Sequence, residues 1–205
     1  MDKADIFNQA TANLMQSKYY HGSNVEIHGD YLQPHEEFNS VQDNVVSGAF
    51  VTSDEKHAKF FAINHCIAGR GQTKKDGNKI YIERLASNIK PDFFVYTVYE
   101  TPDNKFFHDK GTEYYSTKPI KIAEREKCDT AKEIEKLGYE IYVLNEPLKT
   151  KLNKESGNNF AVQQEMDDVI KQKNYHRVDI ASMIEQQSKN GISTMFHELF
   201  HQKND

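Results

Sequence analysis

Two histidines near the C-terminal end of the sequence have the spacing of a zinc-binding motif. His197 and His201 flank Glu198 in the pattern H-E-x-x-H. On a helix this spacing places both imidazoles on one face, where they could hold a zinc ion while Glu198 activates a bound water. Catalytic zinc needs three protein ligands and the motif supplies two, so a helix with polar side chains is the preferred interpretation. A zinc metallopeptidase or metal-binding protein is the alternative hypothesis for function.

A second candidate for chemistry is a histidine in an aromatic segment near the N-terminus. Tyr19, Tyr20 and His21 predict a short strand that Gly22 ends. The glycine directly after the histidine lets the backbone approach a ligand closely. A single histidine at a strand end is most often structural, so its role depends on the residues around it.

Those surrounding residues resemble a known family. Tyr19 to Pro34 read YYHGSNVEIHGDYLQP. This stretch resembles the first active-site strand of the rifampin ADP-ribosyltransferases, which begin Tyr-Tyr-His-Gly-Ser/Thr and continue to a Gly-Asp-x-Leu-x-Pro turn. The His-Gly-Ser/Thr pattern is also similar to the wider diphtheria-toxin and PARP-like branch. Two shorter segments follow in the family's order, GAFVTSD from Gly48 and GTEYY from Gly111. The resemblance covers about half of the chain.

The resemblance implies roles for individual residues. His21 would hydrogen-bond the adenosine ribose of NAD, the Gly22 backbone would hold the nicotinamide amide, and Ser23 belongs to the same binding motif. Phe50 would pack on the nicotinamide in place of the usual Tyr. Glu113 would hold the nicotinamide ribose, where a carboxylate can stabilise the positive charge that develops as the glycosidic bond breaks.

The third position of this site leaves alternatives open. In the rifampin enzymes it is an Asp in the loop after the strongest strand, so Asp103 and Asp109 compete with Glu113. Tyr114 and Tyr115 point in alternate directions along the expected strand, so one lines the pocket and the other the core. Of the two, Tyr114 is assigned to the NAD pocket.

The resulting hypothesis is an NAD-dependent mono-ADP-ribosyltransferase with NAD as substrate and no metal requirement. Its acceptor would be a protein, as for a toxin or effector, or a rifamycin-like small molecule. A catalytically silent NAD- or nucleotide-binding module is a third hypothesis, because Phe50 lacks the usual hydroxyl and the acid is not unique.

Strands and helices must position these residues. Aromatic and β-branched runs predict strands at 19–21, 49–52, 93–99, 119–123 and 139–144. Helical spacing predicts helices at 2–17, from Ser53 to about Cys66, and at 130–137. Residues 79–89 fit either element. A loop or short elements are expected at 24–47, and loops at 69–78 and 101–112. Beyond residue 158 we expect helices and no strand.

These elements predict an α+β fold. The resemblance implies an ADP-ribosyltransferase-like core of two small facing sheets with flanking helices over residues 1–148. Residues 149–205 would form a helical C-terminal appendage. The loops at 35–47 and 100–112 would flank the cleft and determine specificity.

Composition narrows the function further. The chain has 205 residues, with 26 Lys and Arg against 31 Asp and Glu, so its net charge is −5 and broad nucleic-acid binding is not expected. Cys66 and Cys128 are too few and too isolated for a disulfide framework. Neither a signal region nor a membrane-spanning segment is recognisable. The expected location is the cytoplasm, or a target cell reached by a signal-less route.

Overall fold

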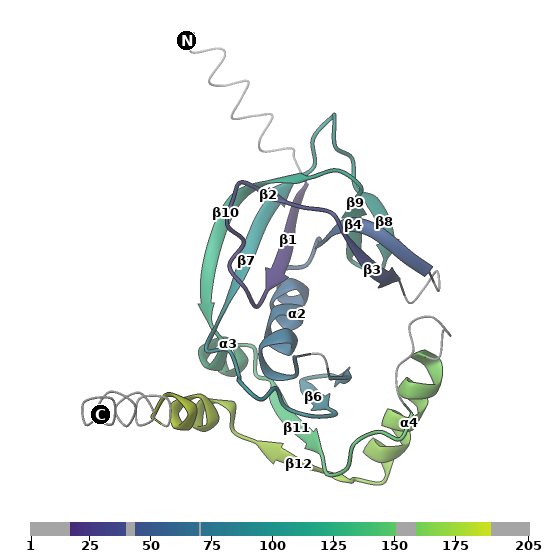
Figure 1. The fold of residues 1–205 in the computed structure, drawn as a ribbon, viewed down its shortest axis with the longest axis vertical. Helices are drawn as coiled ribbons and strands as arrows, with labels where there is room; N and C mark the ends of the chain where they lie inside the picture. The colour runs from purple at the N-terminus through teal and green to yellow at the C-terminus, as the bar shows by residue number, and fades with distance from the viewer. Residues whose placement is uncertain (1–16, 40–43, 70, 151–158, 190–205) are drawn as a thin grey trace, which may run out of the picture. The chain divides into compact units, whose positions relative to one another are not determined.

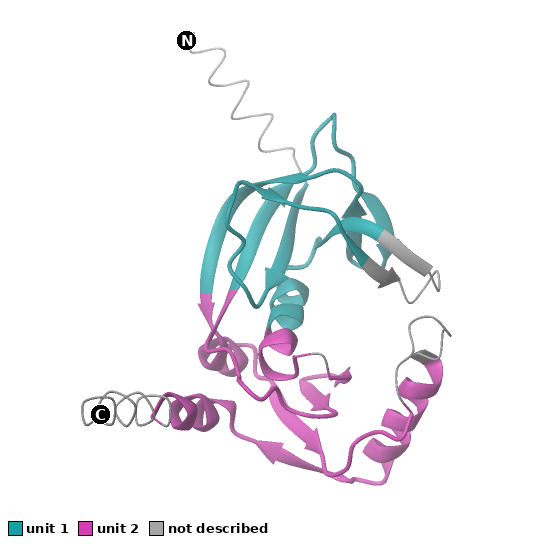
Figure 2. Ribbon diagram, in the orientation of Figure 1, with its two compact units in different colours: residues 1–62, 94–127 teal, residues 63–93, 128–205 magenta. Residues whose placement is uncertain are grey.

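A computed structural model describes residues 17–39, 44–69, 71–150 and 159–189 of the chain. Its residues form two compact units (Figure 2). Unit 1 contains residues 1–62 and 94–127, and unit 2 contains residues 63–93 and 128–205. This division differs from the expected boundary near residue 148, because each unit combines two separate stretches of chain. The helix expected at 2–17 lies outside the described residues.

Unit 1 is built on a large antiparallel sheet (Figure 1). The strand order is β2-β10-β7-β1-β4-β9-β8, and β3 pairs with β4 off this path. The strands are β1 (Lys18–Ser23), β2 (Tyr31–Leu32), β3 (His35–Asn39), β4 (Asn44–Thr52), β7 (Asp92–Tyr99), β8 (Phe107–Lys110), β9 (Glu113–Ser116) and β10 (Ile120–Asp129). The strands with candidate site residues, β1, β4 and β9, are therefore neighbours although they are far apart in sequence.

The core of unit 1 lies against one face of this sheet. Its buried side chains come from five strands and comprise Tyr19, Leu32, Ala49, Val51, Tyr96, Val98, Ile120 and Ile122. On β4, Ala49 and Val51 belong to this cluster, whereas Phe50 and Thr52 alternate with them and point to the other face. The alternation of β4 thus places Ala49 and Val51 on the core face of the sheet and Phe50 on the opposite face.

Helix α2 (Glu55–Ile67) follows β4 directly. Asp54 starts it, because its carboxylate accepts a hydrogen bond from Lys56 N at 2.9 Å and its carbonyl accepts one from Ala58 N at 3.1 Å. Ala58 and Ala62 are buried at helical spacing, 1% and 0% exposed. These small side chains allow the helix to approach β1 closely.

Unit 2 contains a smaller sheet with the order β12-β11-β6-β5. Its strands are β5 (Thr73–Asp76), β6 (Lys79–Ile82), β11 (Glu140–Leu144) and β12 (Tyr175–Val178), and β11 and β6 run parallel. Helices α3 (Thr130–Lys136) and α4 (Asn159–Lys171) and a helix at 180–189 complete the described part of the unit. The Asp129 carboxylate accepts from Lys132 N at 3.0 Å and caps α3.

Helix α4 is held to unit 2 by an apolar contact set. Val162 and Met166, four positions apart, are both 0% exposed and pack with Tyr81, Leu144 and Leu148. The helix therefore contributes to the core of this unit.

Replacing Met166 by Ala should lower the free energy of unfolding by about 2–5 kcal/mol, since it removes a fully buried side chain and leaves a cavity. Urea denaturation measures this change. The Gln164→Ala variant, at an exposed position of the same helix, is the control. It should have the same urea midpoint as the wild type. An unchanged midpoint for Met166→Ala would contradict the packing of α4.

The mixed α+β class is confirmed, and the strands expected at 19–21, 49–52, 93–99, 119–123 and 139–144 are all present. The segment 24–47, expected as a loop or short elements, contains β2 and β3. The loops expected at 69–78 and 101–112 were wrong in part, because they contain β5 and β8. The ambiguous segment 79–89 begins with strand β6. β3, β5 and β8 are short and mostly polar, and each is a strand because it pairs with the next strand along the chain. Their residue types do not indicate this pairing.

The helical appendage predicted for residues 149–205 was wrong in one respect. Tyr175–Val178 form β12, which pairs antiparallel with β11 from Ile141–Val178 to Leu144–Tyr175. The segment therefore adds a strand to the sheet of unit 2. No helix in the described residues has the length and apolar character needed to cross a membrane.

Candidate functional site

The end of β1 carries the best-defined motif of the sequence. His21 Nδ1 lies 2.8 Å from the carbonyl oxygen of Phe50, so the imidazole bridges from β1 to β4. When Nδ1 carries the proton, it donates to this carbonyl and leaves Nε2 as an acceptor. This contact joins His21 to the backbone of Phe50. Because side chains alternate along a strand, His21 lies on the same face as the core residue Tyr19, whereas the Phe50 ring lies on the opposite face.

Gly22 has a packing role that the sequence did not reveal. A Cβ atom at this position would lie 2.0 Å from the carbonyl oxygen of Ala58 and 3.1 Å from Cβ of Ala62. Both contacts are on α2, so only glycine allows the helix to lie this close to β1.

Strands β1 and β4 meet over a short distance. β1 pairs with β7 along its whole length, from Lys18–Tyr99 to Ser23–Phe94. With β4 the register gives one pair in the described residues, Tyr20–Thr52. The His21 side chain reaches from β1 to β4 just beyond that pair.

Phe50 lies in a row of rings that crosses the sheet. Its ring centroid is 5.9 Å from that of Tyr115, and Tyr115 stacks on Phe107 at 5.4 Å. The ring of His35 lies 6.1 Å from Phe50 on the other side. Gly48 makes room for Tyr115, since a Cβ there would be 3.1 Å from Tyr115 Cδ2. Phe107 ends the row and is 53% exposed, so the row presents an exposed aromatic ring beside β9.

Glu113 begins β9 and lies directly across from Thr52 of β4. Its Oε1 is 3.1 Å from Nε2 of His57, and its Oε2 is 3.7 Å from Nζ of Lys110. Because Thr52 also pairs with Tyr20, Glu113 lies two strands from the motif of β1, about 10 Å at ordinary strand spacing. The carboxylate is partly enclosed, with 22% of the side chain exposed.

The pKa of Glu113 is below its usual value. Burial alone would raise it, but the hydrogen bond with His57 and the charge of Lys110 outweigh the burial. Glu113 is therefore ionised at neutral pH and available to stabilise a cation.

The remaining candidate residues take other positions. The Ser23 hydroxyl donates to Val25 O at 2.9 Å and so closes a local turn. The Tyr114 ring packs on Tyr19 at 5.0 Å, on the core side, while Tyr115 shares the side of Phe50. Asp103 is exposed in a turn closed by Thr101 and Asn104.

Asp109 lies on β8, where the register with β9 shifts between His108 and Lys110. Glu113 differs from Asp103 and Asp109 in lying on the strand that pairs with β4.

The sequence analysis missed His57 as a neighbour of the site, and it assigned Tyr114 to the pocket where Tyr115 shares the side of Phe50. His57 is in the first turn of α2, and its distance from Glu113 in sequence hides their contact. The strict alternation of β9 could have indicated Tyr115, because it stands two residues after Glu113 and therefore on the same face.

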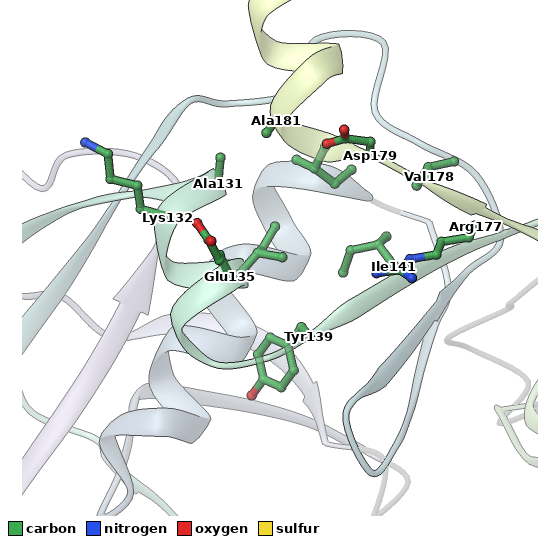
Figure 3. Close-up of a pocket in the computed structure, with 11 residues that line it drawn as sticks. Ala131, Lys132, Glu135, Tyr139, Ile141, Arg177, Val178, Asp179 and Ala181 are labelled. Carbon is green, nitrogen blue, oxygen red and sulfur yellow. The ribbon is translucent and has the colours of Figure 1, made fainter.

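A pocket of about 700 Å³ lies in unit 2, and its lining includes none of the residues that the sequence predicted for the site (Figure 3). Its walls come from α3, β11, β12 and the start of the helix at 180–189, and they include Lys132, Glu135, Tyr139, Arg177 and Asp179. Cations and anions alternate around it, so its charge favours no single class of ligand.

No cluster of three or more His, Cys, Asp or Glu side chains suited to a metal ion occurs in the described ranges. The H-E-x-x-H motif of His197 and His201 lies outside them. The zinc hypothesis therefore stays a prediction.

Comparisons with known proteins found no match to this chain among family models, curated proteins or solved structures.

Proposed function

We propose that the chain is an NAD-dependent mono-ADP-ribosyltransferase whose site lies on β1, β4 and β9. The observation that supports the proposal is the adjacency of these strands, in which His21 Nδ1 contacts the Phe50 carbonyl and Glu113 begins the strand that pairs with β4. The three segments that resemble the transferase family are thus neighbours in space as well as ordered in sequence.

In the proposed reaction, the bond between C1′ of the nicotinamide ribose and the nicotinamide nitrogen breaks, and its electrons leave with nicotinamide. The cationic ribose is stabilised by the Glu113 carboxylate, whose pKa is held below its usual value. A nucleophile of the acceptor then forms a bond to C1′, and its proton is released to solvent. Nicotinamide leaves as a neutral molecule, so positioning supplies much of the acceleration.

The residues divide this work between binding and chemistry. His21 and the Gly22 backbone would hold NAD, and the ring of Phe50 would pack on the nicotinamide. The acceptor is a protein or a small molecule. The exposed ring of Phe107 lies on the same side as Phe50, where it could contact an acceptor.

The test is release of nicotinamide from NAD by purified protein, alone and with a cell lysate as a source of acceptor. His21→Ala should lower release at subsaturating NAD about tenfold or more, because the variant loses a hydrogen bond to the ligand and the bridge to Phe50. His176→Ala, at an exposed position of unit 2, is the matched control and should behave as the wild type. Absence of both release and NAD binding in the wild type would reject the proposal.

A further inference from the structure

The Glu113 carboxylate is engaged at both of its oxygens. His57 reaches Oε1 at 3.1 Å from α2, and Lys110 approaches Oε2 at 3.7 Å from β8. Of the two partners, the His57 side chain is 30% exposed and that of Lys110 is 44% exposed. The shorter contact is thus made by the more enclosed side chain.

A set of hydrogen bonds ties the start of α2 to the residue before Glu113. Ser53 N donates to Thr112 O at 2.9 Å, and the Thr52 hydroxyl donates to the Thr112 hydroxyl at 3.1 Å. Asp54 N in turn donates to the Thr52 hydroxyl at 3.2 Å. These bonds fix the first turn of the helix relative to β9, and this first turn carries His57.

The imidazole of His57 is itself held in place by aromatic rings. The Phe61 ring packs against it at 4.7 Å in an edge-to-face arrangement, and the Phe60 ring lies at 6.2 Å. A ring confined in this way loses little further entropy when it hydrogen-bonds a carboxylate, whereas the flexible chain of Lys110 loses more.

We propose that His57 is a positioning residue that orients the Glu113 carboxylate for the transfer reaction. The inference rests on the proposed function, because it assigns a purpose to the contact within that site. His57 acts through Glu113, and the titratable groups that face this carboxylate are His57 from α2 and Lys110 from β8.

The contact has a direct consequence for pH dependence. Burial raises the pKa of Glu113, and the hydrogen bond with His57 is the largest of the interactions that lower it. Without His57 the effect of burial is less opposed, so the pKa of Glu113 rises. The fraction of ionised Glu113 then falls at a higher pH than in the wild type, and the acid limb of the rate profile moves in the same direction.

The experiment compares His57→Ala, His57→Gln and Lys110→Met with the wild type. Nicotinamide release is measured across pH, and the Glu113 carboxyl carbon is titrated by NMR, with Glu113→Gln used to assign its signal. His57→Ala should lower kcat by about 10- to 10²-fold with little change in KM, as expected for a misplaced catalytic group. Its acid limb and its carboxyl titration should both move to higher pH.

His57→Gln tests the hydrogen bond itself, because its amide can still donate to Oε1. This variant should recover most of the rate and show a smaller shift than His57→Ala. His65→Ala, at an exposed position of the same helix, should match the wild type in both measurements. Thermal unfolding of each variant shows whether it is folded. The Lys110→Met variant removes the positive charge near Glu113 without altering α2.

The wild type could be active while the acid limb and the carboxyl titration are unchanged in folded His57→Ala and His57→Gln. That result would overturn the role of His57 but not the proposed function. A wild type that neither binds NAD nor releases nicotinamide would instead reject the proposed function and this inference with it. In that case the carboxyl titration would still measure the contact between His57 and Glu113, so the two failures are distinguishable.

Discussion

Replacing Glu113 by Gln should reduce nicotinamide release from NAD by about 10²–10³-fold while NAD affinity stays within a few fold of the wild type. The substitution keeps the shape of the side chain and removes its charge. The carboxylate interacts most strongly with the cation that develops during bond breaking, so its loss affects the transition state more than the bound substrate. Release is measured by chromatography, and affinity by titration calorimetry with NAD.

Asp103→Asn and Asp109→Asn are the matched controls for this variant, since each also removes one carboxylate charge. Both should retain most of the wild-type rate. Full activity in Glu113→Gln, together with loss of activity in either control, would assign the third catalytic position to that Asp instead.

Gly22→Ala should destabilise the protein by about 3 kcal/mol or more. The added Cβ would lie 2.0 Å from the carbonyl oxygen and 2.8 Å from the carbonyl carbon of Ala58, and backbone atoms cannot move away by changing rotamer. Relief would require α2 to shift from β1, at a cost at the upper end of that for overpacked cores or beyond it. Chemical denaturation measures the difference.

Gly48→Ala provides a graded comparison in the same sheet. Its nearest contact, at 3.1 Å, is with the side chain of Tyr115, which can tilt, so the expected loss is about 1 kcal/mol. Equal stability of Gly22→Ala and the wild type would show that α2 does not pack on β1 as described. Because Gly22 also belongs to the proposed NAD site, the activity of this variant should be interpreted only after its stability is known.

The strong strands and the helices of the described region could be read from local pattern. Phe93–Tyr99 is dense in aromatic and β-branched residues, and Gly138 follows α3, where it adopts a φ of 67° that favours glycine. The short polar strands could not be read in this way. In β8 and β12 half of the residues are both polar and exposed, and they are strands because β9 and β11 supply their hydrogen-bonding partners.

The sequence by itself determined the candidate site residues, which are a His-Gly-Ser motif, an aromatic residue before a helix, and a later Glu. These are local properties of residue type and spacing. The tertiary structure decided which of them meet, because strand pairing joins β1, β4 and β9 regardless of their separation along the chain. It also decided that His57 contacts Glu113, through hydrogen bonds that join residues 52–54 to Thr112. Such contacts depend on the register of the sheet and on the path of a helix across it, and neither is encoded in a local stretch of sequence.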